Sequence, residues 1–135
     1  MYTNILIPVA LDHEHDISKS IALAQALLGE GGHLTALHVL ESVPGYVEQY
    51  LPPGHAEELR ARMTESMKEQ IGDVDGIKID VVAGHSSNTI LDYANAKQSD
   101  LIIIDSHRPG LQDYFLGSTA ARVVRHARCA VHVIR

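Results

Sequence analysis

Asp100-Leu101-Ile102-Ile103-Ile104-Asp105 is the stretch that decides the fold, because it sets four large aliphatic residues between two acids. A run this short and this apolar is typical of a strand that is buried on both faces. Strands of that kind occur in parallel sheets that helices cover on both sides. Residues 2–10 contain a second such run, Ile5-Leu6-Ile7-Pro8-Val9, and its proline marks the end of regular pairing. The two runs favour an α/β fold.

Weaker strand and helix patterns alternate along the rest of the chain. Asp16 is a candidate cap for the first helix, which Gly31-Gly32 would end, and Ser86 or Ser87 is a candidate cap for the third. This alternation predicts a three-layer α/β sandwich around a parallel sheet. The expected strands cover residues 2–10, 34–40, 77–83, 100–105 and 130–134, and the four expected helices cover residues 17–28, about 55–71, 86–94 and roughly 117–127.

Residues 42–54 interrupt this alternation with prolines and glycines. The segment is longer than an ordinary connection between elements. We therefore expect it to be a lid or a loop that faces a partner.

The length and the net charge of the chain limit the number of domains and the classes of partner that we expect. The 135 residues fit one domain over residues 1–135, and the formal net charge of −6 does not favour a nucleic-acid or anionic-membrane partner. No apolar run is long enough to span a membrane, and the first residues do not resemble a signal peptide, so we expect a cytoplasmic protein. Cys129 has no second cysteine to pair with, and a small packing residue is the preferred interpretation.

The loop after the 100–105 strand is the most informative stretch for function. Ser106-His107-Arg108-Pro109-Gly110 leads to Gly117-Ser118-Thr119 at the start of the last predicted helix. Backbone N–H groups at a helix start, hydroxyls and an arginine together could bind a phosphate. The same residues could equally form only a turn and a helix start.

Other chemistry finds less support in the residues. Neither a dinucleotide-binding nor a P-loop glycine pattern is present. Residues 12–16 hold five potential metal ligands, but a solvated loop is the preferred interpretation, so a metal-dependent enzyme using His13 and His15 is the weakest hypothesis. His38 and His132 lie in apolar strands, where we expect structural, hydrogen-bonded histidines.

The sequence resembles the universal stress protein family across essentially the whole chain. The tail carries the strongest match, and Ser106-His107-Arg108-Pro109 is similar to the loop of a short, single-domain subgroup. The matching segments, which are specific as an ordered set, are residues 4–9, 37–39, 84, 100–104, 106–109, 116–118, 120–121, 123–127 and 131–135.

The resemblance implies a fold, a ligand and an assembly. The implied fold is similar to the adenine nucleotide alpha hydrolase-like fold, with strand order 3-2-1-4-5 and the reversal of winding between strands one and four. The implied ligand is ATP or AMP, with Mg²⁺ as a possible companion, and the implied assembly is a homodimer. Carried over by position, the nucleotide residues are Pro8, Val9, Ala10, Val39, Ile104, Asp105, Ser106, Arg108, Gly117, Ser118 and Thr119, and the dimer residues are Val131, His132, Val133 and Ile134.

Three positions depart from the family's pattern. Asp105 and Arg108 stand where ATP-binding members have glycines, and the stretch to Gly117 is one residue shorter. Ala10 stands where the family usually has an aspartate at the end of strand one. We expect Arg108 to supply charge for the phosphates. We hypothesise that the ribose-accepting carboxylate has moved across the cleft from position 10 to Asp105.

These observations predict a homodimeric signalling or stress-response module that binds an adenine nucleotide, in the first place ATP. No general base is recognisable, so we expect no catalytic residue and at most slow ATP hydrolysis or self-modification. We expect no metal-ligating residues in the chain, no nucleic-acid or membrane partner, and a downstream protein partner of unknown identity. The alternative is a dimer that does not bind nucleotide and acts through protein contacts, with residues 42–54 as the candidate partner site.

Overall fold

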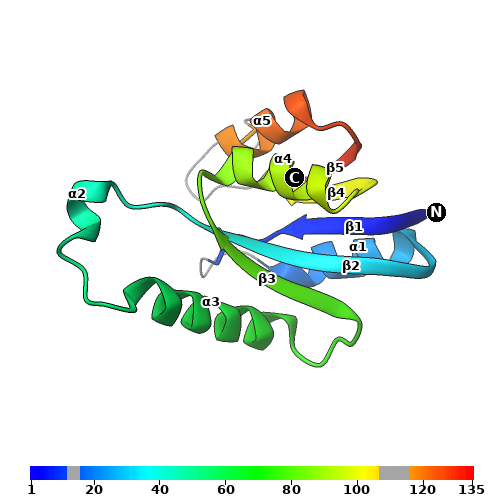
Figure 1. The fold of residues 1–135 in the computed structure, drawn as a ribbon. Helices are drawn as coiled ribbons and strands as arrows, with labels where there is room; N and C mark the ends of the chain where they lie inside the picture. Colours follow the sequence, from blue (N-terminus) through cyan, green and yellow to red (C-terminus); the bar gives the residue numbers. More distant parts are fainter. Residues whose placement is uncertain (12–15, 107–115) are drawn as a thin grey trace.

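The computed structural model describes residues 1–11, 16–106 and 116–135. Its centre is a parallel sheet of five strands in the order β3-β2-β1-β4-β5 (Figure 1). This order and the parallel pairing confirm the fold predicted from the sequence. The elements in chain order are β1 Tyr2–Pro8, α1 Ile17–Leu27, β2 Leu28–Leu40, α2 Gly45–Glu48, α3 His55–Ile71, β3 Ile77–Ala83, α4 Ser86–Ala96, β4 Leu101–Asp105, α5 Ser118–His126 and β5 Ala130–Ile134.

Two apolar layers hold the helices to the sheet. Because side chains alternate along a strand, Ile5 of β1 packs with α1 and α3 on one face, while Leu6 packs with α4 and α5 on the other. In β4, Ile103 and Ile102 divide between the same two faces. The continuous apolar runs of β1 and β4 are thus explained by burial on both sides.

A carboxylate fixes the pairing of the two central strands at their amino-terminal ends. Asp100, just before β4, accepts hydrogen bonds from the backbone N–H groups of Thr3 and Asn4, each at 2.9 Å, and from the Thr3 hydroxyl. Partial burial acts to raise the pKa of Asp100, but these hydrogen bonds outweigh it and hold the pKa below its usual value. The acid at the start of the deciding stretch is therefore a clamp between β1 and β4.

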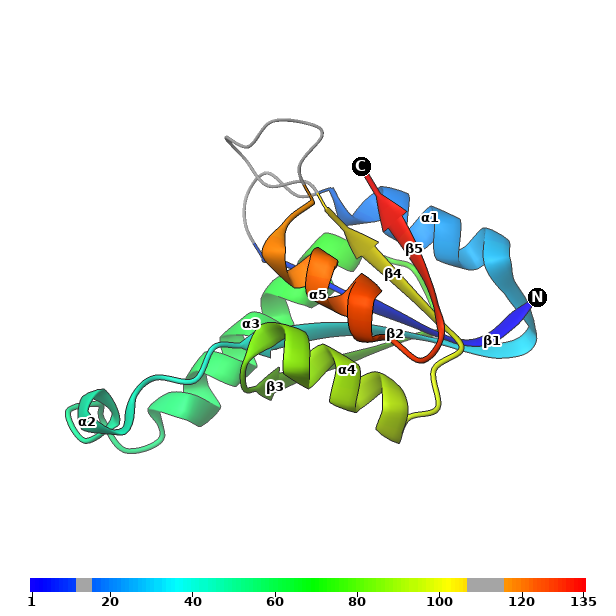
Figure 2. The ribbon, with the colours of Figure 1, turned by 90° about the horizontal axis from the view of Figure 1, so that it is seen from above.

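The prediction of four helices is wrong, because the described residues contain five. The additional helix is α2, one turn within residues 42–54. None of its residues is buried, so no buried apolar stripe marked it in the sequence. Figures 1 and 2 show that α2 stands away from the sheet on an arm that joins β2 to α3.

The start of β2 also differs from the prediction. We expected Gly31-Gly32 to lie between a helix and a strand over residues 34–40, but both glycines lie inside β2, which begins directly after α1. Leu28 pairs with Tyr2 of β1 across a register shift, and this tertiary contact extends the strand backward. The strand over 77–83, the helix over 55–71 and the strand over 130–134 have the predicted bounds.

Candidate functional site

A cavity of about 340 Å³ opens where the carboxyl ends of β1 and β4 meet the first turns of α1, α4 and α5. In Figure 2 the starts of α1 and α5 lie beside the end of β4. This place is the reversal point of the sheet, where ligands of open α/β folds bind. The lining residues are Ile7, Pro8, Val9, Ala10, Asp16, Ile17, Ser20, Leu37, His38, Val39, Ser86, Ile90, Ile104, Asp105, Ser106, Gly117, Ser118, Thr119 and Ala120.

The structure brings together the site residues predicted by position. Arg108 lies outside the described residues, and every other member of the predicted set lines the cavity. Their shared property is that they end a strand or begin α5. These residues are Pro8, Val9, Ala10, Val39, Ile104, Asp105, Ser106, Gly117, Ser118 and Thr119.

Two hydrogen bonds to β2 fix the backbone after β1. The Val9 N–H donates to the Leu37 carbonyl at 2.8 Å, and Nδ1 of His38 lies 2.8 Å from the Val9 carbonyl oxygen. Because a carbonyl only accepts, Nδ1 of His38 carries the proton. His38 is therefore a hydrogen-bonded structural residue, as predicted, and it holds Val9 against the cavity wall.

Ser106 has a structural bond that the sequence did not predict. Its hydroxyl donates to the Ile134 carbonyl at 3.0 Å, and its N–H donates to the same oxygen at 2.9 Å. Both bonds fasten the end of β4 to β5. The hydroxyl proton is thus already used, so Ser106 faces the cavity as an acceptor rather than as a phosphate donor.

In the first turns of α1 and α4, a carboxylate already accepts a hydrogen bond from a backbone N–H group. Asp16 caps α1 as predicted, accepting from the Ser18 N–H at 3.0 Å, and the Ser18 bonds lower the pKa of Asp16. The predicted serine cap of α4 is wrong, since Ser86 is the first helical residue. Glu41, at the end of β2, accepts instead from the Ser86 N–H and hydroxyl. These bonds lower the pKa of Glu41.

The first turn of α5 has no side-chain cap. Gly117 is the N-cap residue, and the first helical bond runs from the Ala121 N–H to the Gly117 carbonyl at 2.8 Å. The N–H groups of Ser118, Thr119 and Ala120 therefore have no partner within the helix. Of the three helix starts that line the cavity, this one keeps its donors for an anion.

Neither the backbone conformation of Gly117 nor the described residues around it require a glycine at this position. Its φ of −59° is one that any residue adopts, and an added Cβ would have its nearest contact with the Ser106 carbonyl oxygen, at 3.5 Å. The described residues therefore leave room for a side chain at this position. A glycine here suits a ligand that approaches the backbone closely.

Two carboxylates, Asp16 and Asp105, stand on the cavity wall. Asp105 is the last residue of β4 and half-buried, and it lines the same cavity as Ala10 after β1. This juxtaposition is what the ribose hypothesis requires. The sequence analysis named Asp16 and Ser86 as candidate helix caps but not as cavity residues, and it missed Ser20 and Glu41. Glu41 could not be found, because its partner lies 45 positions further along the chain.

Other candidate chemistry has less support from the geometry. Across residues 1–11, 16–106 and 116–135, no cluster of three metal-ligating side chains occurs. His13 and His15 lie outside these ranges.

Burial, with the negative charge of Asp100 as a smaller cause, raises the pKa of Cys129, which packs half-buried against the α4 and α5 layer. The cysteine is thus a packing residue, as predicted, and not an activated thiol.

The family profile of the Universal stress protein family matches residues 1–135, and the chain belongs to this family. Universal stress protein G of Salmonella typhimurium is 29% identical over an alignment that covers the whole of both chains. Universal stress protein UspA from Lactobacillus plantarum is 26% identical, with a TM-score of 0.69 over 99% of this chain and 98% of that one. A universal stress protein from Archaeoglobus fulgidus, solved in complex with dAMP, is 16% identical, with a TM-score of 0.59 over 99% and 98%, and shows the same fold.

No helix in the described ranges combines the length and apolarity that crossing a bilayer requires.

Proposed function

We propose that this protein binds an adenine nucleotide, ATP in the first place, in the cavity at the ends of β1 and β4. The observation that carries the proposal is the difference among the three helix starts. Carboxylates cap α1 and α4, whereas α5 presents three backbone donors to the cavity. A phosphate is the ligand group that such a helix start favours.

The rest of the cavity suits a nucleoside. Val9 and Val39 offer apolar surface for a base at the ends of β1 and β2. Asp105 offers a carboxylate that can accept a ribose hydroxyl. A carboxylate beside the phosphates would repel them, so the ribose is the better partner for Asp105. The dAMP complex of the A. fulgidus relative, a ligand with adenine and one phosphate, supports this ligand class.

Calorimetric titration tests the proposal directly. ATP, with and without Mg²⁺, is titrated into nucleotide-free protein, and we expect saturable binding. Asp105→Ala and Arg108→Ala should each weaken it about tenfold or more, because each removes a charge-assisted hydrogen bond. Absence of binding to folded protein would refute the proposal, and tighter ATP binding by Asp105→Ala would refute the role given to that residue.

We also propose that the protein is a homodimer that signals through other proteins rather than by turnover. The outer edge of β5, which pairs with β4 on its other side, has half-buried Val131, Val133 and Ile134, with His132 exposed between them. An unpaired edge strand is a ready surface for a second copy. Sedimentation should give twice the 14.7 kDa of one chain, and a monomer at all concentrations would refute the dimer.

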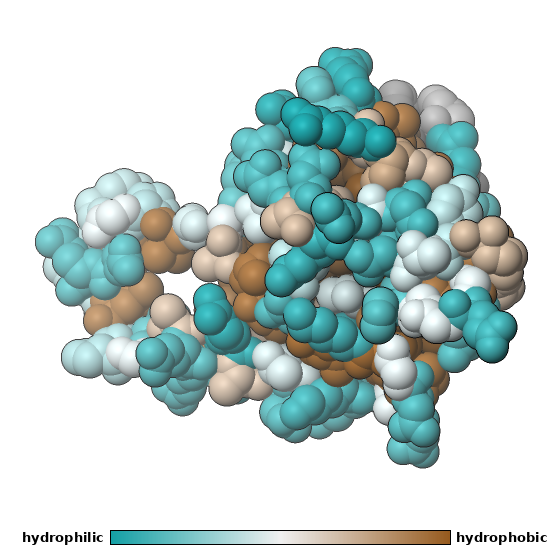
Figure 3. Space-filling model, turned by 45° about the vertical axis from the view of Figure 1, so that its right-hand side comes forward, coloured by the Kyte–Doolittle hydropathy of each residue, from teal (hydrophilic) through white to brown (hydrophobic). Residues whose placement is uncertain are grey.

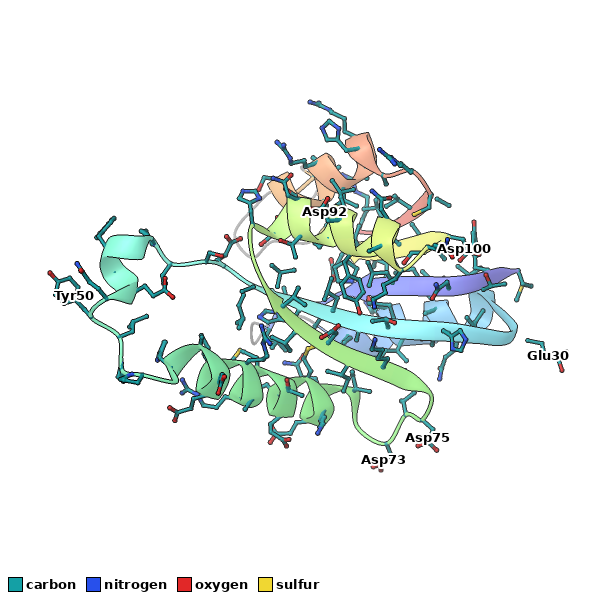
Figure 4. The ribbon with its side chains drawn as sticks, in the orientation of Figure 1. Glu30, Tyr50, Asp73, Asp75, Asp92 and Asp100 are labelled. Atoms are coloured by element: carbon teal, nitrogen blue, oxygen red, sulfur yellow. The ribbon has the colours of Figure 1, made fainter. Side chains whose placement is uncertain are left out.

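One observation favours the second candidate function, a nucleotide-independent dimer that acts through protein contacts. The arm that carries α2 exposes Val43, Tyr46 and Tyr50 by 47%, 72% and 82%. Figure 3 shows brown, apolar atoms on this arm and open space between it and the body, and Figure 4 shows Tyr50 at its outer end. Aromatic side chains in such positions are typical of contact surfaces. Loss of partner contacts in Tyr46→Ala/Tyr50→Ala protein with normal ATP binding would separate the two functions.

A further inference from the structure

We propose that the outward side of α5 is a docking surface for an acidic segment of another protein. The α5 basic face, as we call it, consists of Arg122, Val124, Arg125, His126 and Arg128, all of which are exposed. None of them lines the nucleotide cavity. The inference therefore goes beyond nucleotide binding and does not depend on it.

The positive charge of the chain is concentrated here. Residues 116–135 contain four arginines and no acidic residue, although the whole chain has 11 lysines and arginines against 17 acids. The remaining residues therefore carry all of the acids. Such a separation runs against the net charge of −6, and we expect a locally positive potential at the α5 basic face.

The helix on the other face of the sheet shows what an ordinary solvated surface looks like in this protein. On α3, cations alternate with acids, and Nζ of Lys68 lies 3.4 Å from a carboxylate oxygen of Glu65. Asp73 and Asp75 follow α3 at the side of the molecule opposite to α5 (Figure 4). The α5 basic face has no such mixture, so a solvated ion-pair surface does not describe it.

Stabilisation of the helix end explains only part of the cluster. Arg125 and His126 lie in the last turn of α5, where cations favour the helix dipole. Arg122 lies before the last turn, and Arg128 lies beyond the C-cap residue, so this explanation does not account for them. Asp92 is the acid on the neighbouring helix α4, and among the described residues no ion pair joins it to these arginines. The three guanidinium groups remain available to a partner's carboxylates.

The spacing indicates the chemistry of the partner. Arg122 and Arg125 are three residues apart and so lie on one side of the helix. Val124 is 45% exposed and lies on the adjoining side of the helix, nearer to Arg125 than to Arg122, where it offers an apolar contact. A short segment with several carboxylates and one aliphatic side chain fits this arrangement. A long polyanion fits worse, because it would run from the α5 basic face onto the acid-rich remainder of the molecule.

Fluorescence anisotropy with a defined probe tests the inference. The probe is a short labelled peptide of glutamates around one leucine, mixed with the full chain at low salt. We expect binding that weakens as salt is added and that falls about fivefold or more in Arg122→Gln/Arg125→Gln protein. The matched control is Arg60→Gln/Arg62→Gln on α3, which should bind the probe like the unaltered protein.

Two results would overturn the proposal. Equal weakening by the α3 control, or no weakening by the α5 variant, would overturn the assignment to α5. Tighter binding of a single-stranded oligonucleotide than of the peptide through the same arginines would overturn the choice of a protein partner. Thermal unfolding checks each variant. If removing Arg125 destabilises α5, the single variant Arg122→Gln, which lies outside the last turn, must still weaken probe binding about twofold or more.

Discussion

A side chain at Gly117 should affect the stability of the fold and the binding of the proposed nucleotide differently. Its backbone conformation suits any residue, and among the described residues a Cβ there would touch the Ser106 carbonyl oxygen at an ordinary distance. We therefore expect Gly117→Ala to keep or slightly raise stability, by about 0.4–1 kcal/mol, since alanine restricts the unfolded chain. The added methyl group should nevertheless weaken ATP binding about tenfold, because it holds a phosphate away from the N–H groups of α5.

Gly45→Ala is the matched control for this prediction. Gly45 begins α2, far from the cavity, and apart from its chain neighbours and its own helix no described residue has an atom within 4 Å of the position that its Cβ would take. Thermal unfolding and calorimetry on both variants should show similar stability but a binding defect in Gly117→Ala alone. Unchanged ATP affinity in Gly117→Ala would show that the phosphates do not approach this helix start.

Gly84 shows the opposite case, a glycine that the fold itself requires. Its φ is 154°, and an added Cβ would come within 2.2 Å of the Thr89 hydroxyl oxygen in α4. We expect Gly84→Ala to lower the free energy of unfolding by about 2 kcal/mol. Urea denaturation measures the loss. The double variant with Thr89→Ala should recover only part of it, because the backbone strain remains. A Gly84→Ala protein as stable as the original would contradict this account.

At the scale of elements, the Asp100 clamp predicts a dependence of stability on pH. The pKa of this carboxyl is lower in the folded chain than its usual value of about 3.9. Its stabilisation is therefore fully present above the unfolded pKa and is lost as pH falls through the folded pKa. Asp100→Asn should be less stable than the original protein by about 1 kcal/mol at neutral pH, because the hydrogen bonds from Thr3 and Asn4 lose their charged acceptor.

Thermal unfolding at neutral pH and near pH 3 tests this, with Asp92→Asn, an exposed acid on α4, as the control. The difference between Asp100→Asn and the original protein should shrink at the lower pH, whereas Asp92→Asn should follow the original protein at both. A difference that stays the same size at low pH would mean that the carboxylate charge is not what holds β1 to β4.

The elements also show where sequence reasoning succeeds and where it stops. β1 and β4 could be predicted because burial on both faces requires continuous apolar runs, and such runs are visible in the sequence. α2 and the first part of β2 could not, because one is a single exposed turn and the other depends on pairing with Tyr2. In the site, the lining residues were predicted by position from the resemblance to the universal stress protein family, whereas the bond between Glu41 and Ser86 joins segments that only the fold brings together.

At the scale of the whole molecule, we expect the cavity to bind a nucleotide rather than to turn it over. The titratable side chains on its described wall are Asp16, His38 and Asp105. Asp16 caps α1 and His38 donates to Val9, so both side chains already have a structural role. We expect phosphate release from ATP to be far slower than the roughly 1 s⁻¹ that marks the low end of ordinary enzymes. Steady-state turnover at or above that rate, retained after repurification, would contradict this prediction.

The most direct test of the central claim is a two-dimensional amide NMR titration of the nucleotide-free protein with ATP. We predict the largest shifts at the amides of Ser118, Thr119 and Ala120 in α5 and at Val9 after β1. We predict a smaller shift at Ser86, because Glu41 already occupies that helix start. Shifts confined to the arm around α2, or none at all while the protein stays folded, would contradict nucleotide binding at the end of β1 and β4.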